Sequence, residues 1–384
     1  MNVEKLIQLI PEQDIDFLSV ETNVNHQVKK LHGAVVFKLL LFSMLNSNKV
    51  SYRVMEEIVS SARFIHFLGD RIDVKFNSIR DRICTIEPTF FEQLFHRIFS
   101  VYNEYLGEEK SLVKVDSTYV SIASKLVSWS MQNGQKQKNQ KQVKYSVSMK
   151  GSLPCGVRVF TDAKYISEDL ALSESIMEND FVKGTVVVFD RGLQSRKKFD
   201  QLSAQRISFV TRISPTARIK DMGKNKLKEP IETNTLLIQK DNVGKLSAKD
   251  NKWTNENYRI ITATTKEKQE PIVFLTNNFE LTTEEITTLY KQRWDIELLF
   301  KFLKQHLNLT HIVSRNENAI KVVVYMTMIT AVLLLAYKKL NNKSRGFKIT
   351  KLAFEIELDK LMIKEIVILS GGNPDKVSYL WNST

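Results

Sequence analysis

The chain has 384 residues, of which 43% are apolar and 26% charged, and it carries a formal net charge of +13 at pH 7. These proportions are typical of a soluble globular protein with a sizeable core. The positive charge, with a sequence pI of about 9.4, favours a polyanionic partner, nucleic acid before an anionic membrane surface. Two cysteines, Cys84 and Cys155, are too few for a disulfide framework and suit a reducing cytosol.

No segment is predicted to act as a signal peptide or to cross a membrane. The N-terminal residues lack signal-peptide architecture. The apolar run 322–337 is shorter than the roughly 20 residues that a membrane span requires. We therefore predict that this run forms a buried core helix.

Residues 1–108 are predicted to form a helical domain. Apolar periodicity indicates a helix at 28–45, another opens at Ser51, and one begins near 78, where Ser78 and Asp81 have capping-box spacing. The aromatic-rich segment 90–105 is predicted to pack in the core of this domain. The helix near 78 carries two candidate DNA contacts, Arg80 and Arg82, in the manner of a helix-turn-helix protein. A packing domain with scattered surface arginines is an equal alternative.

Residues 109–213 are predicted to begin an α/β domain. The segment 111–123 alternates and is rich in β-branched residues, so it predicts a strand that contains Asp116. Further strands are predicted at 145–149, 156–160, 185–190 and 207–213, with helices at 168–179 and 195–204. The strand at 185–190 is of the buried type and ends in Asp190.

A basic segment at 134–144 is predicted to be a flexible loop between two of these strands. Its lysines are candidates for contacts with phosphate backbones, and they are Lys136, Lys138, Lys141 and Lys144. A solvated linker is the ordinary alternative for such a charge run. Farther along, residues 214–270 are predicted to be a β-rich insertion and 271–345 the second part of the α/β domain; 346–384 form a tail with no assigned role.

The segment 281–309 has the period of one long amphipathic helix, with Thr282 and Glu285 placed as a capping box. Four polar residues on it fall within an arc of roughly 60° that overlaps the apolar side: Tyr290, Arg293, Glu297 and Lys304. A charged stripe that faces inward requires a partner, because unpaired buried charge is costly. Ion pairs along a solvated face, such as Arg293 with Glu297, are the alternative.

Three carboxylates are the candidate catalytic residues. Asp116 and Asp190 each lie in or at the end of an apolar strand, so two adjacent strands would bring them together, and Glu297 could join them from the long helix. Carboxylates that lie close together repel each other, and a pair of Mg²⁺ ions would relieve this repulsion and activate a water against a phosphodiester. Asp162 and Asp295 are the alternative acids, of the kind that caps turns.

Other catalytic chemistries find no support in the sequence. The six histidines show neither an HExxH motif nor zinc-ligand spacing, and no phosphate-binding glycine motif is present.

The order Asp116-Ser117-Thr118, then VVVFDRGL with Asp190, then Tyr290-x-x-Arg293-x-x-x-Glu297 with six residues before Lys304, resembles the DDE transposases of bacterial insertion sequences. More narrowly, it is similar to the group with the Tyr-Arg-Glu-Lys signature, the insertion sequence four family. The resemblance implies an RNase H-like α/β core interrupted by the β-rich insertion, which follows the N-terminal helical domain predicted above from the sequence pattern. It further implies an enzyme whose Asp116, Asp190 and Glu297 ligate two Mg²⁺ ions, which Mn²⁺ could replace.

The resemblance also implies what this enzyme would contact. Its partners would be DNA, as terminal inverted repeats and as target, with a homodimer on the DNA and no membrane, in a bacterial cytoplasm near the nucleoid. Near the cleaved phosphate, the DNA contacts would be Tyr290, Arg293 and Lys304. Trp294 or Trp253 would stack on a flipped base, although core packing is the favoured role for both.

Two other functions remain open from the sequence. A structure-selective nuclease or resolvase on the same fold would cleave DNA without joining it. A catalytically inactive DNA-binding regulator would retain the basic surface, but the three intact acids argue against it.

Overall fold

The computed structural model describes residues 3–47, 50–107, 112–122, 131–132, 141–179, 181–223, 226–248, 252–307, 309, 314, 316–341 and 346–380. It is a mixed α/β structure with a large sheet and many helices. The chain divides into two compact units. Unit 1 comprises Met1–Glu108, Leu153–Cys155 and Phe300–Thr384, and unit 2 comprises Glu109–Ser152 and Gly156–Leu299.

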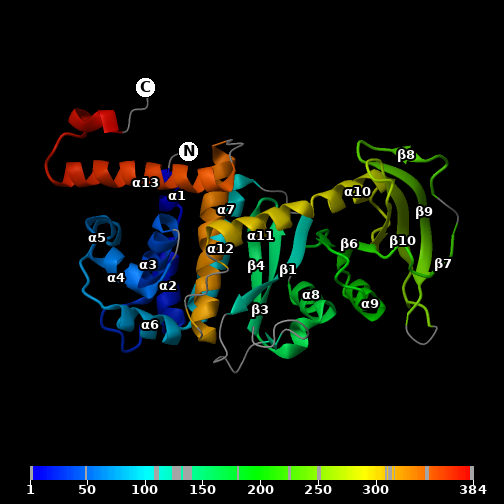
Figure 1. Ribbon diagram of the computed structural model, residues 1–384, viewed down its shortest axis with the longest axis horizontal. Helices are drawn as coiled ribbons and strands as arrows, with labels where there is room; N and C mark the ends of the chain where they lie inside the picture. Colours follow the sequence, from blue (N-terminus) through cyan, green and yellow to red (C-terminus); the bar gives the residue numbers. More distant parts are fainter. Residues whose placement is uncertain are drawn as a thin grey trace. The chain divides into compact units, whose positions relative to one another are not determined.

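Unit 1 is helical and is built around one apolar helix, α12 (Glu317–Leu340). By length and composition, α12 is the one helix among the described residues that could cross a membrane, yet 94% of its most apolar window is buried inside the protein. The prediction of a core helix is therefore confirmed. The other helices of this unit, shown in Figure 1, are α1 (Val3–Gln8), α2 (Glu12–Glu21), α3 (Gly33–Asn46), α4 (Tyr52–Ser60), α5 (Ala62–Leu68), α6 (Phe76–Thr85), α7 (Pro88–Leu106), α13 (Phe347–Leu369) and the 3-10 segment η3 (Pro374–Leu380).

Local sequence signals explain where several of these helices begin and end. Ser51 caps α4 as predicted, because its hydroxyl accepts the amide of Val54. α7 ends at Gly107, whose φ of 59° is easily adopted only by glycine. The helix predicted from residue 28 begins only at Gly33, and α6 begins at Phe76 with Lys75 as its cap, so the expected capping box of Ser78 and Asp81 is wrong.

Unit 2 contains an 11-stranded sheet with the main order β2-β3-β1-β5-β6-β11-β10-β9-β7, in which β4 also pairs with β3 and β8 with β9. β1 runs antiparallel to β3 but parallel to β5, and β5 is parallel to β6. The strands are β1 (Leu112–Ile122), β2 (Met131–Gln132), β3 (Lys141–Lys150), β4 (Leu153–Phe160), β5 (Val186–Phe189), β6 (Ser208–Ile213), β7 (Ile219–Asp221), β8 (Ile231–Glu232), β9 (Leu236–Leu246), β10 (Tyr258–Thr265) and β11 (Pro271–Thr276). The region predicted to be β-rich contains β7 to β10.

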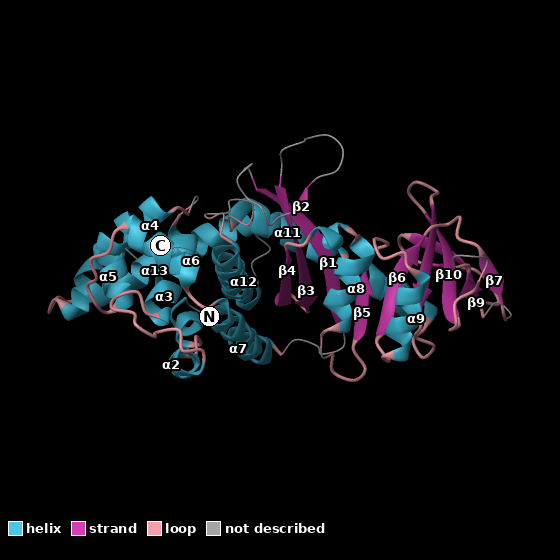
Figure 2. Cartoon of the chain, turned by 90° about the horizontal axis from the view of Figure 1, so that it is seen from below, coloured by secondary structure: helices cyan, strands magenta, loops and turns pink. Residues whose placement is uncertain are grey.

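Helices cover both faces of this sheet. Figure 1 shows α8 (Glu168–Met177) and α9 (Arg196–Ala204) on one face and α10 (Thr283–Lys291) on the other, and Figure 2 shows α8 and α9 in front of the strands. The 3-10 segment η1 (Ala163–Ile166) precedes α8. The alternation of strand side chains explains this arrangement. Val186 and Val188 of β5 pack with Ile286 of α10, whereas Phe189 packs against Phe209 on the other side.

The single helix predicted over 281–309 is wrong in one respect, because the structure breaks it in two. α10 ends at Lys291, and α11 runs over Trp294–His306. At the break the amide of Arg293 bonds the carbonyl of Tyr290, three residues back, which is a tighter turn than α-helical pairing. No glycine or proline lies there, so contacts made by the two helices, and not a local breaker, account for the break.

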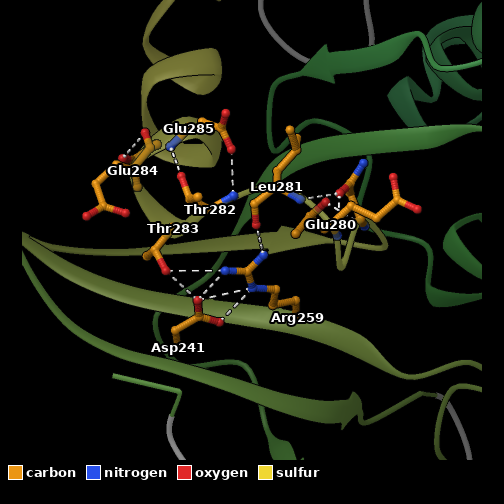
Figure 3. Close-up of polar contacts among 11 residues, drawn as sticks. Asp241, Arg259, Glu280, Leu281, Thr282, Thr283, Glu284 and Glu285 are labelled. Atoms are coloured by element: carbon orange, nitrogen blue, oxygen red, sulfur yellow. Dashed lines mark hydrogen bonds and ion pairs between the residues drawn. The ribbon is translucent and has the colours of Figure 1, made fainter. Parts of the chain in front are cut away.

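One of these contacts is a buried polar network that holds the start of α10 on β9 and β10 (Figure 3). The guanidinium of Arg259 in β10 bonds the carboxylate of Asp241 in β9, with an Nη2–Oδ2 distance of 2.6 Å, and also reaches the carbonyl of Leu281. The hydroxyl of Thr283 donates to the same carboxylate at 2.7 Å. The predicted capping box of Thr282 with Glu285 is present next to it.

Replacing Arg259 with methionine should lower the free energy of unfolding by about 3–5 kcal/mol, because a fully buried carboxylate then loses its guanidinium partner. Chemical denaturation followed by circular dichroism measures the loss. The control is Lys266→Met, which breaks the exposed pair with Glu232 and should leave the free energy of unfolding nearly unchanged. Equal losses in the two variants would contradict the role of the Arg259 network.

Candidate active site

The backbone brings Asp116 and Asp190 side by side. β1 and β5 are parallel neighbours, and their register pairs Val115 with Phe189, immediately before the two aspartates. Alternation along β5 puts Asp190 on the same face as Val188, the face that α10 covers. The prediction that adjacent strands bring these two carboxylates together is thus confirmed.

Asp116 is held in a setting that favours its neutral form. Burial raises the pKa of its carboxyl to about 6, and the negative charge of Asp190 acts in the same direction. The amide of Ser117, which donates to Oδ1 at 2.8 Å, and the charge of Arg293 oppose the rise without cancelling it.

Asp190 lies in a more cationic setting. Burial again acts to raise its pKa, but the amide of Arg191, the charges of Arg293 and Arg212, and the hydroxyl of Tyr290 together outweigh burial and lower it. The Tyr290 hydroxyl donates to Oδ1 at 3.1 Å, and Nη2 of Arg212 lies 3.6 Å from the same oxygen. The two aspartates are therefore pushed in opposite directions, with Asp190 favoured as the charged one.

Arg293, in the turn between α10 and α11, lies between the acids. Its Nη2 donates to Oε1 of Glu297 at 2.7 Å, while its Nε is 4.0 Å from Oδ1 of Asp190, too far for a hydrogen bond. The arginine side chain is only 9% exposed, and Nε is buried without a hydrogen-bond partner among the described residues. A buried unsatisfied donor of this kind is costly and is available to an incoming acceptor.

Arg212, near the end of β6, is a site residue that the sequence patterns did not single out. Its guanidinium carbon lies 5.2 Å from the centre of the Tyr290 ring, and that of Arg293 lies 5.8 Å from the same ring. Its buried Nε also has no hydrogen-bond partner among the described residues. The available signal was a charged residue within an otherwise uncharged strand, which pairs with the strand that ends before Asp190.

The donor set fits a hard divalent cation at the two aspartates. Mg²⁺ prefers carboxylate oxygens and commonly takes only one or two from the protein, with the rest from water or substrate phosphates. A cation at Asp116 and Asp190 would offset the repulsion that helps to raise the pKa of Asp116. In the described part of the chain, however, no group of three or more His, Cys, Asp or Glu side chains is placed to hold a metal, and Glu297 is paired with Arg293.

The loop after Asp190 is fixed by the start of α8. Oδ1 of Asp169 accepts the amides of Gln194 and Ser195, at 2.6 and 2.7 Å. Gly192 lies so close to Glu168 that an added Cβ would stand 2.7 Å from its Cγ. The glycine of the DRG sequence therefore lets α8 approach the loop that carries Asp190.

Several predicted DNA contacts lie elsewhere or differ in setting. Lys144 is not in a loop: it is fully buried in β3, with Nζ 2.8 Å from Oε2 of Glu168, so that expectation is wrong. Arg82 is half-buried and donates to the carbonyls of Leu31 and Val24, so it is not the exposed residue expected, whereas Arg80 is exposed and paired with Asp81. Lys141 is the first residue of β3, so the predicted loop is wrong for it as well, although its side chain is not among those described. Lys136 and Lys138 lie outside the described residues.

The two tryptophans differ from each other. Trp294 is 57% exposed at the first residue of α11, so the favoured prediction of core packing is wrong for it. Trp253 is half-buried and its backbone bridges Ser247. Lys304 is half-buried in the last turn of α11, within the part of that helix that belongs to unit 1.

The raised pKa of Asp116 predicts a pH dependence of stability. Because the folded state binds this proton more tightly than the unfolded chain, whose carboxyl titrates near 3.8, the group stabilises the fold at acid pH, and this contribution is lost as the pH rises to about 6. The free energy of unfolding of Asp116→Asn should lack this loss. Carboxyl NMR titration, with Asp116→Asn to assign the signal, should give a midpoint near 6; a midpoint near 4 would contradict the prediction.

Comparison with known proteins identifies the family. A protein-family model described as "Transposase DDE domain" matches residues 107–333. A relative from Synechocystis sp., named as a transposase for insertion sequence element IS4SA, is 30% identical over 242 residues, which are 59% of this chain and 60% of the relative. One from Geobacillus stearothermophilus, named for insertion sequence element IS5377, is 25% identical over 228 residues, 59% of this chain and 56% of the relative.

The matches to these curated relatives thus span about three fifths of the relatives' length. A solved structure, the piggyBac transposase synaptic complex with hairpin DNA, aligns with 95% of this chain and 82% of its own at 9% identity and a TM-score of 0.45. Because the family model matches more than half of the sequence, this chain belongs to the transposase DDE domain family.

Proposed function

We propose that the chain is a DNA transposase that cuts the ends of an insertion sequence and joins them to target DNA. The observation that carries the proposal is the adjacency of Asp116 and Asp190 on parallel strands, inside the stretch that matches the family. Arg293 lies near Asp190 and pairs with Glu297, and so connects the third acid to the other two. We assign β4-β3-β1-β5-β6 to an RNase H-like core, into which the strands β7 to β10 are inserted.

Asp116, Asp190 and Glu297 would hold two Mg²⁺ ions, or Mn²⁺ in their place. When bound, such ions activate the attacking oxygen and stabilise the leaving oxygen of a phosphodiester. For Glu297 to bind a metal ion, its carboxylate releases the guanidinium of Arg293 and takes the cation as its partner instead. The freed guanidinium then has an anionic partner available in the DNA phosphate, to which arginine can donate two parallel hydrogen bonds.

The remaining side chains of the site would position DNA. Tyr290 and Arg212 fix the orientation of Asp190 and of each other, and both arginines present donors toward a phosphate. Trp294, exposed next to Arg293, offers a face on which an unpaired base can stack. Farther contacts with DNA are proposed for Lys304, Lys136, Lys138, Lys141, Trp253 and Arg80.

The partners follow from this chemistry. The net charge of +13 suits binding to the phosphate backbones of terminal inverted repeats and target DNA, with an affinity that falls as salt increases. Joining two ends in one reaction requires a paired complex, for which we propose a homodimer on DNA. The site of action would be the bacterial cytoplasm, at the nucleoid.

Removing any of the three acids should abolish cutting. With terminal-repeat DNA and Mg²⁺ or Mn²⁺, Asp116→Asn, Asp190→Asn and Glu297→Gln should each slow cleavage by more than about 100-fold, the upper range for loss of residues that only support metal ligands. Gel assays of nicking and strand transfer measure both steps. The control is Asp162→Asn, a cap of η1 that should cut normally; full activity of Glu297→Gln would overturn the assignment of the third acid.

Replacing Trp294 with alanine should weaken base stacking by about 1–3 kcal/mol, whereas phenylalanine should preserve most of it. A 2-aminopurine placed at the terminal base of the element reports stacking through quenching of its fluorescence. Trp253→Ala should leave the quenching unchanged. If quenching is lost in Trp253→Ala and kept in Trp294→Ala, the stacking role passes to the insertion.

A further inference from the structure

A buried lysine beside the two aspartates has no role in the proposed chemistry. Lys114 lies in β1 two residues before Asp116, so alternation places both side chains on the same face of the strand. Its side chain is only 2% exposed. Lysine is rarely buried without a specific partner, because desolvation penalises its charge.

The partner is Asp295, in the first turn of α11. Nζ of Lys114 lies 3.0 Å from Oδ2 of Asp295, and it also donates to the carbonyl of Gly151 at 2.7 Å. Asp295 stands two residues after Arg293 and two before Glu297. The ion pair therefore links the strand that carries Asp116 directly to the helical turn that carries Glu297.

We propose that Lys114 and Asp295 form a positioning pair that fixes the first turn of α11 over β1 and so sets where Arg293 and Glu297 stand relative to Asp116. The inference rests on the proposed function only for its catalytic consequence. Asp295 does not contact the reacting atoms in this proposal; it acts through the helix turn.

The break before α11 is what makes a separate anchor necessary. In one continuous helix, the Arg259 network at the start of α10 would also fix Glu297, because helical geometry transmits position along the axis. The turn at Gln292 and Arg293 interrupts that transmission. A displacement of about 1 Å at a catalytic group can slow a reaction by about 100-fold, so the second helix requires its own tether.

The test uses the full chain with Lys114→Met, which keeps the length of the side chain and leaves no buried charge. We expect faster amide hydrogen exchange at 294–299, unchanged exchange at β5 and β6, and DNA cleavage in Mn²⁺ slower by about 10–100-fold. Asp295→Glu should restore much of the lost rate relative to Asp295→Asn, because it keeps the charge. Lys114→Met with Asp295→Asn should be no slower than the worse of the two single variants.

The matched control is Leu202→Ala, which removes a fully buried side chain of α9 and lowers stability without touching the pair. It should cut at close to the normal rate at a temperature where both variants are folded. Unchanged exchange at 294–299 in Lys114→Met, or equal slowing by Leu202→Ala, would overturn the inference. If the unchanged protein does not cleave DNA, the proposed function fails, while hydrogen exchange still decides whether the pair fixes α11.

Discussion

The crowding of two largely buried carboxylates, Asp116 and Asp190, is the constraint around which the candidate active site is arranged. Parallel pairing of β1 with β5 brings the two carboxylates together, and burial strengthens their mutual influence. Arg212 and Arg293 offset this negative charge, and Arg293 also pairs with Glu297. The cost of unpaired charge in a buried setting explains why so many cationic groups converge on one strand edge.

The surrounding fold supplies the rigidity that such an arrangement requires. On one side of the sheet, Asp169 caps the loop after Asp190, and Gly192 allows α8 to approach it. On the other side, Arg259 secures α10. Each contact acts on backbone segments next to site residues, which places the reactive groups on supported elements.

The sequence predicts the strands and acids well because their signals are local. Alternation and β-branched residues identify β1 and β5, and the positions of Asp116 within one strand and of Asp190 at the end of the other predict that the two acids lie close together. The same reasoning fails where a distant partner decides. The sequence predicts that Lys144 lies in a basic loop, but in the structure it is buried and paired with a carboxylate of α8. The sequence predicts that Arg82 is exposed, but in the structure it donates hydrogen bonds to backbone carbonyls of a neighbouring segment. The break between α10 and α11 has no breaker residue, so periodicity could not reveal it.

The strand order has one more consequence, for how this domain could be altered. β11 pairs with β6 on one side and with β10 on the other, so the strands between residues 214 and 270 extend the same hydrogen-bonded sheet instead of hanging from it. Deleting these strands would leave β11 as an exposed edge strand, whose unpaired backbone groups could pair with other chains and cause aggregation. It would also remove Asp241 and Arg259, which hold the start of α10 in place. A shortened domain would therefore lose solubility and the fixed position of Tyr290 together.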